Sequence, residues 1–167
     1  PKRTAEEMGY GGARIIAFVL VAGGALGILN SVSTGLHTAH QQQSLRVISA
    51  IISAALFAWG ILTGIALWRA TPHGFKWAKI LFALQVPVFS AGRLVYEFST
   101  LLSLRVMIGN TSRYVGGDIG SSSTIYLSSQ SLGFLFGLNI VAVLALVYLI
   151  RSSRSTSRSF LGSTAAG

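Results

Sequence analysis

The chain has 167 residues, of which 51% are hydrophobic and only 10% are charged, and its mean hydropathy is +0.64. A soluble domain carries about 25% charged residues, so this chain has too little charge to cover a surface that faces water. The net charge of +9 is spread over short polar segments without a basic stripe, and cysteine is absent, which argues against nucleic-acid binding, disulfide-stabilised modules and thiol catalysis.

Four apolar segments are each long enough to cross a membrane, which takes about 20 mostly apolar residues. They are residues 13–36, 47–68, 77–102 and 132–150. The first is longer than the apolar part of a signal peptide, about 7–15 residues, so we interpret it as a retained helix. We therefore expect an all-α integral membrane protein with four transmembrane helices in residues 13–150, between an N-terminal segment, 1–12, and a basic, serine-rich tail, 151–167.

The distribution of lysine and arginine predicts the orientation of these helices. Nine of the 13 basic residues flank one side of the predicted membrane domain, and four flank the other. Because basic residues concentrate on the cytoplasmic side, we expect a multi-pass protein of the cell membrane (plasma or inner membrane) with both termini in the cytoplasm. Trp68 and Trp77 flank the predicted inner loop, as aromatic residues do at the membrane boundary.

A long outer loop, at about residues 105–131, is expected between the third and fourth helices. Residues 104–108 and 124–127 have the composition of strands, and glycine, asparagine and aspartate between them suit turns. The pattern leaves two alternatives open, a small external β-hairpin and an irregular glycine- and serine-rich loop.

Small residues recur at four-residue spacing on three of the predicted helices, where they let helix backbones approach closely. They are Gly23, Gly27, Ser31 and Gly35 on the first helix, Gly60 and Gly64 on the second, and Gly133 and Gly137 on the fourth. The spacing favours packing within one four-helix bundle, and the alternative is a docking surface for a second protein.

Polar residues on three of the predicted helices are expected at a similar depth in the outer half of the membrane. These residues are Asn30 on the first helix, Gln85, Arg93, Tyr96 and Glu97 on the third, and Asn139 on the fourth. Charged groups in hydrocarbon are costly, so we expect Arg93 and Glu97 to face the protein interior or a partner protein, with Asn30 or Asn139 within hydrogen-bonding reach. The cluster is either an internal structural network or a ligand-binding pocket that opens outward.

Enzyme chemistry and cofactor binding have no support in the sequence. His37 and His40 lack further ligands nearby, so we expect no metal, and no haem ligands lie within the predicted helices. With only four acidic residues and no catalytic motif, an enzyme is not expected.

These observations favour a non-catalytic membrane subunit, which would be an accessory, scaffold or assembly component of a larger complex or a homo-oligomer. Its expected partners are membrane lipids and other membrane subunits or further copies of itself, without nucleic acid. The alternative is a small transporter, channel or ligand- or lipid-binding membrane protein that uses the outer polar cluster.

Overall fold

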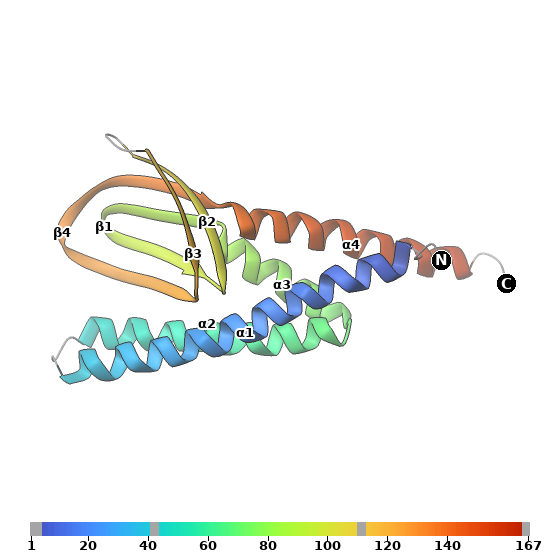
Figure 1. Cartoon of the computed structure of the whole chain (residues 1–167), viewed down its shortest axis with the longest axis horizontal. Helices are drawn as coiled ribbons and strands as arrows, with labels where there is room; N and C mark the ends of the chain where they lie inside the picture. The colour runs from blue at the N-terminus through green and yellow to red at the C-terminus, as the bar shows by residue number, and fades with distance from the viewer. Residues whose placement is uncertain (1–4, 41–43, 110–112, 165–167) are drawn as a thin grey trace.

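The computed structural model describes residues 5–40, 44–109 and 113–164 (Figure 1). This part of the chain forms four helices and a four-stranded antiparallel sheet. In chain order the elements are α1 (Ala5–His40), α2 (Ser44–Trp68), α3 (Pro72–Gln85), β1 (Pro87–Ser99), β2 (Leu102–Gly109), β3 (Arg113–Ile119), β4 (Ser122–Asn139) and α4 (Ile140–Thr164).

Helices α1 and α2 form an antiparallel hairpin, and both are candidates for crossing a membrane. Residues Gly11–Thr38 and Arg46–Trp68 are long and apolar enough to do so, in agreement with the first two predicted segments. Much of their apolar surface is uncovered within the chain, since Ile15, Leu29 and Leu62 are each at least 67% exposed. Such an outward apolar face is expected of a helix in contact with lipid and not of a core helix of a soluble domain.

The expectation of an all-α protein with four transmembrane helices is wrong, and the third segment gives one reason. Helix α3 ends at Gln85, and β1 begins at Pro87. A proline lacks the N–H that continues a helix, and the valine- and phenylalanine-rich residues that follow favour a strand. With 14 residues α3 is about 21 Å long, which is shorter than a hydrocarbon core of about 30 Å.

The fourth predicted helix is divided in the same way. Residues 132–139 belong to β4, and α4 begins only at Ile140. Asn139 caps α4, because its side-chain oxygen accepts a hydrogen bond from the backbone N–H of Ala142 at 3.4 Å. The apolar part of α4 is the short stretch Ile140–Ser153, so a four-helix transmembrane bundle is not what the chain forms.

The sheet has the strand order β1-β4-β2-β3 and replaces the expected outer loop. Residues 104–108 and 124–127 are strands, as their composition predicts, but they lie in β2 and β4, which belong to one larger sheet. The hairpin in this region joins β2 and β3, with Ile108 opposite Arg113.

Strands β1 and β4 each bend back on themselves, so that they form two nested U shapes (Figure 1). The bend in β1 is at Gly92, where the register with β4 shifts and φ is +61°, a conformation that glycine adopts without steric cost. Across the bend, the Phe89 and Tyr96 rings stack with their centroids 5.4 Å apart. The bend brings the end of β1 back to the end of α3.

The core lies where the sheet and helices α3 and α4 pack on the α1–α2 hairpin. The Phe57 ring of α2 contacts the Phe98 ring of β1 at a centroid distance of 5.2 Å, and both side chains are buried. The sheet lies beside the end of the hairpin at which α1 and α2 connect, and α4 extends toward the opposite end (Figure 1). This arrangement places the polar residues of the sheet next to the connected halves of α1 and α2.

Candidate functional site

Charged residues of the sheet meet in a group that we call the ion cluster, formed by Glu97, Arg105 and Asp118. Arg105 Nη1 lies 2.6 Å from Glu97 Oε1, and Nη2 lies 3.5 Å from Asp118 Oδ2. The side chains of Glu97 and Arg105 are each only 18% exposed. Ser122 donates to Glu97 at 2.9 Å, and Arg105 Nε donates to Ser103 at 3.2 Å, so the network joins all four strands.

In the ion cluster Glu97 pairs with a residue that the sequence did not predict as its partner. Sequence spacing suggested Arg93 on the same helix face or an asparagine on a neighbouring helix. The segment is a strand, and Glu97 instead pairs with Arg105 from β2, a residue that the sequence predicts in the outer loop. The side chain of Arg93 lies outside the described residues.

Gln85 and Tyr96 connect β1 to α3. Gln85 is 1% exposed, and its Oε1 accepts hydrogen bonds from the backbone N–H of Thr100 at 3.2 Å and from its hydroxyl at 3.0 Å. The Tyr96 hydroxyl donates to the Leu84 carbonyl oxygen at 2.6 Å. Partial burial of the Tyr96 phenol, which lies outside the two candidate membrane spans, raises its pKa above 10.0. Both residues therefore hold the folded-back end of β1 against the helix.

Asn30 and Asn139 make separate contacts. Asn30 Nδ2 donates to the Ser121 carbonyl oxygen at 3.5 Å, whereas Asn139 Oδ1 accepts from the backbone N–H of Leu104 at 3.4 Å in addition to capping α4. The five members of the predicted polar cluster whose side chains are described thus lie in several different contacts at the junction of sheet and helices. Their role in binding a ligand stays a prediction.

The small residues on α1 and α2 lie mainly in contacts within the chain. A Cβ at Gly27 would overlap the Phe57 ring, one at Gly64 would come within 2.8 Å of the Ala17 carbonyl oxygen, and one at Gly23 would meet the backbone at Leu101. Gly35 approaches Ala50, and Gly60 approaches Leu81 more loosely.

The two remaining small residues, Gly133 and Gly137, are in β4 and not on a helix. A Cβ at Gly137 would meet the Val106 carbonyl oxygen at 2.6 Å, so this glycine permits the close approach of β4 and β2. A Cβ at Gly133 would meet nothing within 4 Å. Gly133 and Gly137 therefore do not have the predicted role in helix packing, because both lie on a strand.

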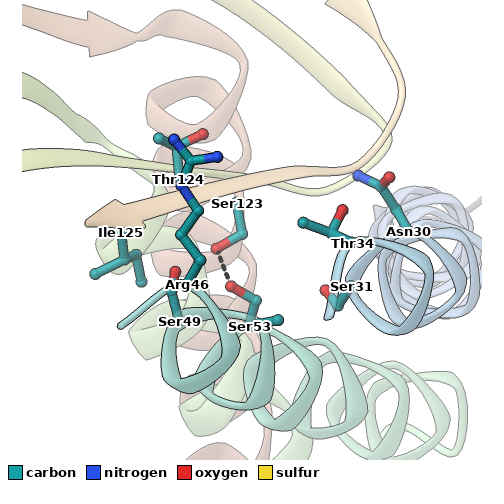
Figure 2. Close-up of a pocket in the computed structure, with 10 residues that line it drawn as sticks. Asn30, Ser31, Thr34, Arg46, Ser49, Ser53, Ser123, Thr124 and Ile125 are labelled. Atoms are coloured by element: carbon teal, nitrogen blue, oxygen red, sulfur yellow. Dashed lines mark hydrogen bonds between the residues drawn. The ribbon is translucent and has the colours of Figure 1, made fainter. Parts of the chain in front are cut away.

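A cleft of about 310 Å³, which we call the polar cleft, lies between α1, α2 and the first half of β4 (Figure 2). Most of its lining residues carry an amide, a hydroxyl or a guanidinium group. They are Asn30, Ser31 and Thr34 of α1, Arg46, Ser49, Ala50 and Ser53 of α2, and Ser123, Thr124 and Ile125 of β4. Ser53 donates to the Ser123 hydroxyl at 2.7 Å, which fastens α2 to β4 along one wall of the cleft.

The polar cleft includes Asn30 and Ser31 from the predicted sets, but sequence reasoning missed its other residues. A signal for them is present in α2, where Arg46, Ser49 and Ser53 recur at spacings of three and four residues on an otherwise apolar helix. That spacing places polar groups on one helix face, which lipid would not favour. The strand residues of the cleft could not be paired with this face, because the sheet itself was not predicted.

Groups of three or more potential metal ligands do not occur in residues 5–40, 44–109 and 113–164. The polar groups that the polar cleft offers to a ligand are its hydrogen-bonding side chains and its one arginine. Comparison with models of known protein families, with curated proteins and with solved structures finds no match to this chain.

Proposed function

We propose that this chain is a multi-pass membrane protein that acts as a non-catalytic, self-associating subunit. Membrane insertion is supported by the two candidate spans and their exposed apolar faces. Basic residues gather where α1 begins and α2 ends, since Arg14 and Arg69 line the same hollow, and the Arg14 guanidinium lies 5.9 Å from the Trp68 ring centroid. Lys79 donates to Ser153 at the same end. By the positive-inside rule this end, with both chain termini, faces the cytoplasm.

The observation that carries the proposed subunit role is an uncovered apolar surface on the sheet, which we call the outer apolar face. Paired residues point to the same side of a sheet, so the register places Val106 beside Leu138 and Val115, and Ile108 beside Phe136. The surface consists of Leu102, Leu104, Val106 and Ile108 of β2, Val115 and Ile119 of β3, and Phe134, Phe136 and Leu138 of β4, all between 38% and 83% exposed. A contiguous apolar patch of this kind marks an interaction surface.

The edge of the sheet favours a second copy of the same chain as the partner. Among the described strands, β3 pairs with β2 alone, so its other side offers backbone groups that no described strand pairs, and its sequence has no lysine or proline to block pairing. An antiparallel pairing of two β3 strands about Gly116 would place Tyr114 opposite Asp118 of the second copy. No like charges would then lie opposite each other, and the two outer apolar faces would form one continuous surface.

The mass of the purified protein in native-lipid particles tests this proposal. We expect a dimer, which Ile119→Lys should convert into a monomer because Ile119 is 83% exposed on the pairing strand. Leu94→Lys on β1, at the other edge of the sheet, is the matched control and should leave the dimer intact. A monomeric wild type would overturn self-association, as would a stoichiometric complex with a different membrane protein in place of the dimer.

A further inference from the structure

We propose that the polar cleft binds a phosphate-type oxyanion. Its lining combines one guanidinium with an amide and several hydroxyl groups, and contains no acidic side chain. Such donors bind phosphate through charge-assisted hydrogen bonds, and an arginine suits phosphate best because its planar fork can make two parallel bonds. This inference goes beyond the proposed subunit role and does not depend on it.

Arg46 supplies the positive charge of the cleft, and nothing within the described residues neutralises it. The described ion pairs, Arg105 with Glu97 and with Asp118, both belong to the ion cluster. Arg46 is exposed at the mouth of the cleft and extends from α2 toward β4 (Figure 2). Its five N–H donors are therefore available to an anion that enters from solvent or from the membrane surface.

The hydroxyl groups of the cleft are also available as donors. Ser31 is only 7% exposed, and its side chain makes no hydrogen bond within the described residues, although it lines the cleft. The Ser123 hydroxyl oxygen accepts a hydrogen bond from Ser53, which leaves the Ser123 O–H free to donate to a ligand. The Asn30 amide makes only a weak 3.5 Å contact, so it too can turn to a ligand.

The small volume and the position of the polar cleft indicate that its ligand is a small chemical group. Ligand sites usually measure about 300–1,000 Å³, and this cleft of about 310 Å³ is at the lower limit. It lies near the connected ends of α1 and α2, where a helix that crosses the membrane would leave the hydrocarbon. A phosphate at this place can come from a phospholipid headgroup or from a free phosphate compound.

Calorimetric titration of the full chain in an uncharged detergent distinguishes these sources. The two probes are inorganic phosphate and dihexanoyl phosphatidic acid, a short-chain lipid with a phosphate headgroup. Binding of both with similar affinity would identify the phosphate group alone as the ligand, whereas binding of only the lipid would identify a headgroup site. Failure of both probes to bind would overturn the proposal.

Variants test whether the cleft is the site. Arg46→Gln should weaken binding at least tenfold, and Thr34→Val should weaken it severalfold through the loss of one hydroxyl. Arg113→Gln is the matched control, because it removes an exposed arginine on β3 away from the cleft and should change the affinity less than twofold. An unchanged affinity in a folded Arg46→Gln protein would refute the assignment, whatever the oligomeric state of the chain.

Discussion

Removal of the Arg105 charge should destabilise the sheet, because this mostly buried guanidinium connects all of the ion cluster. Its guanidinium makes the 2.6 Å contact with Glu97, the 3.5 Å contact with Asp118 and the hydrogen bond to Ser103. Removing one partner of a buried pair costs about 3–5 kcal/mol, and a hydrogen bond to a charged group contributes about 1.5–3 kcal/mol. Glu97 keeps 18% exposure and the Ser122 hydrogen bond, so we expect Arg105→Leu to cost about 2–3 kcal/mol.

The assay is reversible denaturant unfolding of the full chain in detergent micelles, with Arg113→Gln as a control that should change stability by less than about 0.5 kcal/mol. A double-mutant cycle with Glu97→Gln and Arg105→Gln should give a coupling energy of about 1–2 kcal/mol. The reasoning would be refuted if Arg105→Leu were as stable as the wild type, or if the effects of the two glutamine substitutions simply added.

Four further outcomes are expected. Asn139→Ala should cost about 1 kcal/mol in the same assay through loss of the α4 cap, whereas Asn139→Ser, which keeps an uncharged capping oxygen, should lose less; equal losses would contradict the capping role. Gly27→Ala should cost about 1–3 kcal/mol, because its methyl group would overlap the Phe57 ring, and a neutral effect would mean that α1 and α2 pack differently. Since burial raises the pKa of Tyr96, the folded chain keeps this proton when the unfolded chain loses it, so stability should fall as pH rises above about 10, and less so in Tyr96→Phe. In the cysteine-free chain, a single cysteine at His73 should be labelled only from the cytoplasmic side and one at Arg113 only from outside; labelling of both from one side would refute the proposed topology.

The sequence allowed the helical hairpin to be predicted but not the sheet. Hydropathy and length suffice for α1 and α2, because each is a single uninterrupted apolar run. The third and fourth runs are also mostly apolar, but each changes secondary structure partway, at Pro87 and at Asn139. A window of average hydropathy cannot detect that change, since apolar strands and apolar helices can have the same average hydropathy.

Part of the missing information was nevertheless local. A proline at the start of a valine- and phenylalanine-rich run, and an asparagine before an apolar helix, are standard signals for a strand and for a helix cap. The partner of Glu97 was not accessible in this way, because its contact with Arg105 depends on how β1 and β2 are placed in the sheet. The same holds for the polar cleft, whose arginine is on α2 while its strand wall is on β4.

The nested bends of β1 and β4 determine the order in which the protein can fold. Helices α1 and α2 are neighbours in sequence and can pair as soon as both are synthesised, whereas β1 needs β4 along its whole length, from Pro87 opposite Leu138 to Ser99 opposite Ser122. Distant pairings of this kind close slowly, because the entropy of the intervening loop is lost before the contacts form. During biosynthesis the valine- and phenylalanine-rich strand β1 therefore stays unpaired until β4, the strand with which it forms hydrogen bonds, has been synthesised. In that interval Phe98 can be buried only against the α1–α2 hairpin, which is already formed and carries its native contact, Phe57.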